Sequence, residues 1–299
     1  LITFDDLHFE NNIAVGGGGA ITIENADSSF FIFNNSNFFR NQAIISIDPE
    51  TGERFSGGFG GAIYLVSRDT PLATIYKFES CSFIDNFAQL AGGAIYAVND
   101  QPQLLPSVIF QNNTIMGITG LRFQNIASHP AQLMIHSETL PSNNYRILEN
   151  GITEISGIAS DQPFNISLQI QLHDLYGQTV EYDNSSNLFI KAENDFSFSS
   201  SVLNFVANKG IYTIKDVRFI STPGKKVQVS FESSLIPTFT YPREPSSLSK
   251  LKIIFHFNDC PLGYTIRENQ ACQSCKDGYY IINSHVNSYE NCKQCDNKR

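Results

Sequence analysis

Residues 83–95 have the sequence Phe-Ile-Asp-Asn-Phe-Ala-Gln-Leu-Ala-Gly-Gly-Ala-Ile, and this stretch contains both phrases that decide the fold. The first phrase, Phe-x-x-Asn, occurs four times, at Phe9–Asn12, Phe38–Asn41, Phe83–Asn86 and Phe110–Asn113. The second phrase, Gly-Gly-Ala-Ile, follows the first three, at Gly18–Ile21, Gly60–Ile63 and Gly92–Ile95. In the fourth copy we expect it to have decayed to Gly117-Ile-Thr-Gly-Leu121. Two phrases in one constant order indicate an internal repeat.

The spacing between the phrases changes in one copy. Six positions separate Asn from the glycine pair in the first and third copies, and nineteen separate them in the second. The second copy therefore carries an insertion within Ile44–Gly58. Its segment Asp48-Pro-Glu-Thr-Gly52 is typical of a turn, so we expect the insertion to protrude from one face. Insertions in repeat proteins often carry binding, and a passive loop is the alternative.

Each repeat unit is a strand-turn-strand piece that cannot bury its apolar face alone. Stacking such units at about 4.8 Å per coil buries a continuous core and pairs every strand with its neighbours. We expect the motif Phe to point inward and to stack on the Phe of the next coil. The motif Asn suits a turn and can also bond along the stack. The repeats therefore predict a right-handed parallel β-helix over residues 1–126.

These paired phrases resemble the repeats of chlamydial-type polymorphic outer-membrane proteins. Similar repeats occur in very large ciliate-type surface proteins with a pectin-lyase-like β-helix. The resemblance covers about residues 1–126, and it implies surface display with adhesion or scaffolding rather than a known reaction.

After residue 127 the repeat gives way to spaced strand patterns. Residues 164–172 alternate between apolar and polar, the period of a half-buried strand. Further strands are expected at 187–192, 202–206, 210–220, 225–232 and 250–257. The pattern predicts an antiparallel β-sandwich over residues 127–258. It resembles the filamin- or invasin-type immunoglobulin-like modules of surface proteins, on the phrases Leu168–Gly177 and Gly210-Ile-Tyr212.

Two smaller interpretations concern this middle segment. We expect Tyr212 and Phe219 to lie in the core. We interpret the basic pair Lys225-Lys226, beside Gly224, as a solvated turn.

Five of the six cysteines lie in the segment 259–299. Cys272-x-x-Cys275 and Cys292-x-x-Cys295 have the spacing of a zinc ribbon. That alternative leaves Cys260 unexplained, and thiols of secreted proteins pair in an oxidising compartment. The phrase Cys-x-x-Gly-Tyr occurs at both Cys260 and Cys275, and it resembles the cysteine-rich repeats of growth-factor receptors and tumour-necrosis-factor receptors. This resemblance implies a small disulfide-rich tail with Cys260–Cys272 and Cys275–Cys292 pairs, and a partner for Cys295 beyond Arg299.

The overall charge excludes some functions. The chain has 299 residues, with 20 Lys and Arg against 29 Asp and Glu, a net charge of −9. Nucleic-acid binding needs clustered Lys and Arg, so we expect no nucleic-acid partner. The sequence contains no run of 18 apolar residues, so we expect no membrane-spanning segment in it. Both ends look cut from a larger surface protein, and we expect no cofactor.

Enzymes with a β-helix resemble each other in clustering acidic residues, often with Arg, Lys or His, on one face. The candidates for a polysaccharide lyase or hydrolase are Asp5, Asp6, Asp85, Arg40 and Arg122. Glycoside hydrolysis needs two carboxylates at a fixed separation. Asp5 and Asp6 are adjacent and face opposite sides of a strand, and Asp85 is at a variable, exposed position. We therefore expect no enzyme.

Two further sets of residues are candidates for chemistry. Cys81, two positions before Phe83, shares the inward side with it, which predicts a buried, inert and unpaired thiol. Sequons for N-glycosylation occur at Asn34, Asn112, Asn165 and Asn184, about as many as chance provides.

Three hypotheses for function follow. The first is a non-enzymatic extracellular structural protein of a cell-surface coat or filament, whose partners are like copies or neighbouring chains. The second is an adhesin or receptor ectodomain that binds a glycan or protein ligand along the solenoid face. The third is a polysaccharide-active enzyme. Open solenoid ends favour the first, because unpaired strand edges template further pairing.

Overall fold

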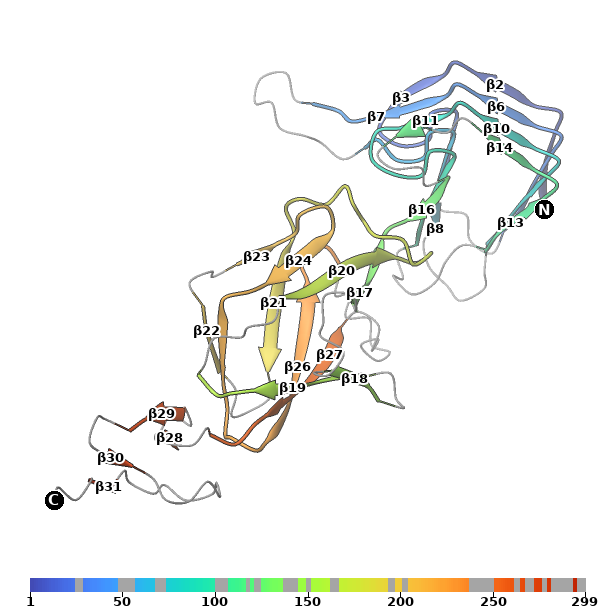
Figure 1. The fold of residues 1–299 in the computed structure, drawn as a ribbon. Helices are drawn as coiled ribbons and strands as arrows, with labels where there is room; N and C mark the ends of the chain where they lie inside the picture. Colours follow the sequence, from blue (N-terminus) through green and yellow to red (C-terminus); the bar gives the residue numbers. More distant parts are fainter. Residues whose placement is uncertain are drawn as a thin grey trace.

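The computed structural model describes residues 1–24, 29–47, 57–67, 74–99, 107–116, 119–120, 125–136, 145–148, 152–161, 167–192, 197–200, 204–236, 250–260, 264–266, 272–275, 279–280 and 293–294. Regular structure within these residues is β-strand throughout, which confirms the expected all-β class. Along the chain, Figure 1 shows a coiled stack of strands, a second group of sheets and a small tail. In the described part, no helix is long and apolar enough to cross a membrane.

The first part, which we call the solenoid, consists of four sheets with four parallel strands each. The first sheet contains β1 (Ile2–Asp5), β5 (Phe30–Asn34), β9 (Ile75–Glu79) and β13 (Ser107–Gln111). The second contains β2 (His8–Glu10), β6 (Asn37–Phe39), β10 (Ser82–Ile84) and β14 (Thr114–Met116). The third contains β3 (Ile13–Val15), β7 (Gln42–Ile44), β11 (Phe87–Ala88) and β15 (Thr119–Gly120). The fourth contains β4 (Ile21–Glu24), β8 (Ile63–Ser67), β12 (Ile95–Asn99) and β16 (Ile126–Ser128). Each coil thus adds one strand to every sheet, as in a parallel β-helix.

The motif phenylalanines fill the solenoid core in stacks. Phe9, Phe38 and Phe83 stack through successive coils with ring centroids 5.3 and 4.8 Å apart. A second column on the neighbouring sheet contains Phe33 and Phe78, with centroids 4.9 Å apart. Such pairs stabilise a fold by about 0.5–1.5 kcal/mol beyond their buried area. The expected inward stacking of the motif Phe is confirmed.

The register corrects the alignment of the fourth repeat. Phe110 pairs with Phe78 in the first sheet, whereas Ile115 pairs with Phe83 in the second. Phe110–Asn113 is therefore not a fourth copy of the Phe83–Asn86 phrase. Both the first and the second sheet present an inward Phe three positions before a turn residue, and the sequence alone does not separate the two columns.

The same register shows that Gly117–Leu121 does not replace the glycine pair. Thr119 and Gly120 pair with Phe87 and Ala88, and the counterpart of Ile95 is Ile126.

The glycine pairs are required by backbone geometry. Gly60 has a φ of 66°, and a Cβ there would lie 2.2 Å from the carbonyl oxygen of Ile63. A Cβ on Gly61 would lie 2.1 Å from the carbonyl oxygen of Gly93 in the next coil. Only glycine allows this left-handed bend and this close approach of two coils.

The second group of sheets, which we call the middle module, comprises strands β17 to β27. One sheet contains β17 (Pro130–Ile135), β20 (Leu168–Asp174) and β24 (Ile211–Ile214), all antiparallel. A six-stranded sheet contains, in order, β18 (Tyr145–Ile147), β19 (Thr153–Ile158), β27 (Leu251–Phe257), β26 (Lys226–Ser233), β21 (Asn187–Ala192) and β23 (Phe205–Val206). A third pairs β22 (Ser197–Ser200) with β25 (Val217–Ile220). The β19–β27 pair is parallel, which differs from the wholly antiparallel arrangement expected.

Side chains from all three sheets enclose one hydrophobic core, which includes Ile170, Phe219 and Phe255. Tyr212 and Phe219 are fully buried, as expected. The strand expected at 210–220 is instead β24 and β25, because Asp216 between them adopts a left-handed φ of 56°.

The remaining strands form two short hairpin pairs in the tail. They are β28 (Tyr264–Ile266) with β29 (Cys272–Ser274), and β30 (Tyr279–Tyr280) with β31 (Lys293–Gln294).

Candidate functional site at the junction of solenoid and middle module

A ladder of asparagine side chains runs along the solenoid. The Asn41 amide nitrogen donates to Asn86 Oδ1 at 3.0 Å and to the Phe9 carbonyl at 3.0 Å. Its Oδ1 accepts from the side chain of Asn12 at 2.8 Å. Asn41 and Asn86 are fully buried, and Asn86 Nδ2 donates to the Phe38 carbonyl. These bonds run along the stack, as expected for the motif Asn, and they tie the first three coils together.

The candidate catalytic residues lie in two separate turn columns. Asp5 and Asp6 lie at the turn between the first and second sheets, and Asp5 Oδ1 accepts from Asn34 Nδ2 at 2.7 Å. Arg40 and Asp85 lie at the turn between the second and third sheets, where they form an exposed ion pair at 3.8 Å. The strands of the second sheet separate the two columns. Arg122 lies outside the described residues.

Cys81 is a buried thiol inside the solenoid. It is 1% exposed, and its Sγ donates to the Phe33 carbonyl at 3.3 Å. Burial raises the pKa of the Cys81 thiol, so the reactive thiolate is disfavoured. Asn113 occupies the equivalent position in the next coil, and its Oδ1 accepts from Cys81 N at 2.7 Å.

Only the ends of the insertion Ile44–Gly58 fall within the described residues. Ile47 is exposed there, and residues 48–56 lie outside the described part.

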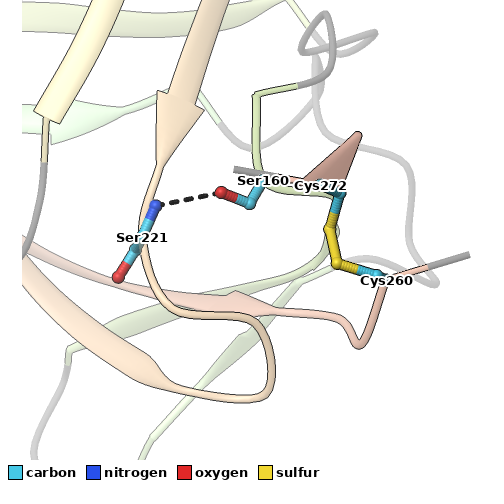
Figure 2. Close-up of a disulfide and its surroundings, with 4 residues drawn as sticks. All are labelled: Ser160, Ser221, Cys260 and Cys272. Atoms are coloured by element: carbon cyan, nitrogen blue, oxygen red, sulfur yellow. Dashed lines mark hydrogen bonds between the residues drawn. A yellow bond between two sulfur atoms is a disulfide. The ribbon is translucent and has the colours of Figure 1, made fainter. Parts of the chain in front are cut away.

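Cys260 and Cys272 form a disulfide with a Cα–Cα distance of 5.5 Å, the first pair expected from the sequence. Figure 2 shows it beside the end of the middle module, where Ser221 N donates to Ser160 Oγ at 3.1 Å. The second expected pair includes Cys292, which lies outside the described residues, as does Cys295.

The sequons differ in their surroundings. Asn112 is exposed at a left-handed turn with a φ of 53°, so its side chain faces solvent. Asn184 is also exposed, and its Oδ1 accepts from Lys209 N at 2.9 Å. The Asn34 side-chain amide donates a hydrogen bond to Asp5, and Asn165 lies outside the described residues.

An aromatic cluster joins the fourth sheet of the solenoid to the middle module. Tyr64 and Tyr96 are paired on adjacent strands and point outward, because their neighbours Ile63 and Ile95 fill the core. Yet Tyr96 is only 3% exposed. Its ring lies 4.4 Å from that of Phe59, and Tyr182 of the middle module packs edge-on against Phe59 at 5.4 Å. Burial raises the pKa values of Tyr96 and Tyr182.

A buried carboxylate completes the junction. Asp174, at the end of β20, is 2% exposed and accepts from Ser128 N of the solenoid at 3.0 Å. It also accepts from the backbone N–H groups of Tyr176 and Gln178. Desolvation raises the pKa of Asp174 although these three bonds oppose it. Gln178 Nε2 returns a bond to the Ile126 carbonyl at 2.8 Å.

The junction joins the solenoid to the middle module through aromatic packing and hydrogen bonds. In the described residues, no three His, Cys, Asp or Glu side chains are placed to hold a metal ion. Sequence reasoning missed Tyr96, Tyr182 and Asp174. The one available signal was the pair Tyr64 and Tyr96, two aromatic residues repeated at outward positions.

Comparison with known proteins gives one family match. The Chlamydia polymorphic membrane protein repeat matches residues 6–24 and 80–98. These are the two repeat copies with the six-residue spacing, in the first and third coils. The match agrees with the resemblance noted for residues 1–126.

Two individual proteins are similar to the chain. It is 25% identical over 232 residues to "Metabotropic glutamate receptor-like protein R" of Dictyostelium discoideum, covering 73% of this chain and 14% of that protein. The chain thus spans about a seventh of that relative. "Crystal structure of the S-layer protein SbsC domains 4 and 5" aligns at 13% identity and a TM-score of 0.25, over 44% of this chain and 55% of that one. That TM-score is too low for an argument about fold or function.

Proposed function

We propose that this chain is a non-enzymatic structural part of a cell-surface coat or filament, displayed outside the cell. The observation that carries the proposal is the solenoid of parallel coils whose repeats match the polymorphic membrane protein repeat. The buried junction supports it further, because Tyr96, Tyr182 and Asp174 hold solenoid and middle module as one stiff unit.

The finer assignment of the fold belongs to the same proposal. Parallel strands connected through a crossover are right-handed in almost all known cases, which supports a right-handed solenoid. The sheet orders β17-β20-β24 and β19-β27-β26-β21 around one core support an immunoglobulin-like sandwich. The Cys260–Cys272 disulfide supports a cysteine-rich tail that follows it.

The absence of catalysis is also proposed on geometry. A glycosidase needs two carboxylates flanking one bond. Asp5 and Asp6 lie in one turn column and Asp85 in the other, where Arg40 pairs with it. Assays of cleavage on acidic and neutral polysaccharides test this point directly.

Labelling of intact cells that produce the protein tests the location. Antibodies against the chain should stain unpermeabilised cells, and external protease should remove the staining. Electron microscopy of material extracted without reductant should then show regular fibres or arrays. Staining that requires permeabilisation would contradict the proposal. Surface staining with dispersed particles that capture a glycan would favour the adhesin hypothesis instead.

A further inference from the structure

One face of the middle module carries a concentration of positive charge. Arg146, Lys191, Lys226, Lys250 and Lys252 lie on the outer face of the six-stranded sheet, together with Glu154 and Glu232; we call this set the basic face. The register places them there, since Arg146 pairs with Glu154, and Ser230 pairs with both Lys191 and Lys252. The alternate residues of the same strands, such as Ile155, Val229 and Ile253, fill the core.

Two buried carboxylates, Glu154 and Glu232, each form ion pairs with two of these cations. Glu154 lies 3.0 Å from Lys226 Nζ and 3.1 Å from Arg146, and its side chain is 5% exposed. Glu232, at 8% exposure, lies 2.5 Å from Lys191 Nζ and 2.8 Å from Lys250 Nζ.

Each carboxylate therefore has two cationic partners, so each cluster keeps a net positive charge. Lys252 is exposed on the same face, and no ion pair is recorded for it within the described residues. The basic face carries five cations against two carboxylates, a net +3, on a chain whose total charge is −9.

The solenoid has the opposite charge. Residues 1–126 contain twelve Asp and Glu against five Lys and Arg. Asp5 at the end of β1, Asp6 in the turn that follows and Glu10 at the end of β2 are exposed; we call these three residues the acidic flank. Residues 1–24 contain neither Lys nor Arg, whereas Asp85 at the other turn is neutralised by Arg40. With His8, which lies 3.1 Å from Glu10, counted as neutral, the acidic flank carries −3, opposite in sign to the basic face.

We propose that the basic face of one copy binds the acidic flank of a second copy. Like-charged faces repel, so the contact joins two different surfaces. A pair then retains one unused basic face on one copy and one unused acidic flank on the other. Such a heterologous contact extends into an open head-to-tail chain when rotation does not close it. The inference rests on the proposed structural function and names the contact that would build the coat.

Paired variants test this contact in the full chain. The face variant, Arg146→Gln with Lys252→Glu, lowers the net charge of the basic face by three units and leaves Lys226 as the lysine or arginine partner of Glu154. The flank variant, Asp5→Asn with Asp6→Asn and Glu10→Gln, removes the three negative charges. The control, Lys209→Gln with Lys215→Glu, makes the same charge change as the face variant at exposed sites off the basic face. Circular dichroism and thermal unfolding establish that each variant folds.

Sedimentation at two salt concentrations gives the result. Raising salt from about 0.1 M to about 1 M shortens the Debye length from about 10 Å to about 3 Å. The wild-type chain and the control should form oligomers beyond the dimer at low salt and dissociate at high salt. Each of the other two variants alone should stay monomeric, with an apparent dissociation constant raised about tenfold or more. Their equimolar mixture should form dimers and stop there, because it contains one intact pair of surfaces.

Three outcomes overturn the proposal. They are a wild-type chain that stays monomeric at low salt, a mixture that does not dimerise, and a control that loses association like the face variant. An anionic polysaccharide is the other ligand that a basic surface could bind, and heparin is the probe for it. If the face variant loses heparin binding while the wild type does not self-associate, the face serves an anionic polysaccharide. Surface arrays that persist with the face variant would overturn this contact and leave the proposed function standing.

Discussion

Replacing Asn41 with alanine should open the solenoid core far more often than in the wild type. Asn41 is fully buried, and its side chain bonds to Asn12, Phe9 and Asn86. Alanine removes four such bonds, two of them accepted from Asn12, each with a net value of about 0.5–1.5 kcal/mol, and it leaves the Phe9 carbonyl without that donor. We therefore expect a loss of about 3 kcal/mol in the free energy of opening, which is about 100-fold in the opening equilibrium.

The buried thiol of Cys81 provides the assay. A thiol reagent reaches it only when the solenoid opens, because the side chain is 1% exposed. Labelling under native conditions, with mass spectrometry to assign the modified residue, gives the rate at Cys81. The Asn41→Ala variant should label about 100-fold faster. Asn37→Ala is the matched control, because Asn37 is exposed on the adjacent strand and its loss should change the rate by about twofold or less.

A labelling rate for Asn41→Ala within about threefold of the wild type would refute the reasoning. It would mean that the ladder adds little beyond the phenylalanine stacks. Equal acceleration by Asn37→Ala would show that any change on the second and third sheets loosens the coil, whatever hydrogen bonds it removes.

Three further predictions use the same structure. Gly61→Ala should destabilise the solenoid by about 3 kcal/mol or more, measured by Cys81 labelling, since its Cβ would lie 2.1 Å from the Gly93 carbonyl oxygen. Cys81→Ser should cost about 1 kcal/mol or less in thermal unfolding, because serine keeps the donor and Ser36 already occupies this column. Desolvation raises the pKa of Glu154, but hydrogen bonds from Lys226 and Arg146 outweigh it and lower the pKa overall. The native state then binds fewer protons than the unfolded state, so this stabilisation is present above the usual pKa of about 4.3 and is lost as pH falls through the lower native value. Denaturant midpoints of Glu154→Gln should vary less over that range than those of the wild type.

The repeat made much of the solenoid predictable. Phe9, Phe38 and Phe83 recur with one spacing, and a residue that recurs in stacked coils contacts its own equivalents. The same logic failed at Phe110, because two columns of inward Phe side chains run through the coils. The fourth coil lacks the glycine pair that would show which column Phe110 belongs to. Local pattern thus fixes the period of the coil, and the register between neighbouring coils decides which column a residue joins.

Contacts between segments far apart in the chain could not be predicted from the sequence. Tyr96 and Tyr182 are 86 positions apart, and Tyr182 lies outside any strand, so no periodicity points to it. Lys225 and Lys226 are both exposed, as the expected solvated turn requires, but only Lys225 lies in the turn. Lys226 begins β26 and pairs with Glu154, 72 positions away. A charged residue at a strand end looks the same in sequence whether it faces solvent or a buried partner.

The junction gives the proposed assembly its direction. The acidic flank is on the solenoid and the basic face on the middle module, so the angle between successive copies is set where the two parts meet. Asp174 holds that angle by accepting from Ser128 N, and it belongs to neither surface. In Asp174→Asn an amide N–H would face one of the three backbone donors, at a cost of about 2 kcal/mol. We expect fibres of this variant in electron micrographs to be less straight than those of the wild type, with little change in the dissociation constant between copies. Unchanged straightness would show that the aromatic cluster of Phe59, Tyr96 and Tyr182 alone fixes the angle.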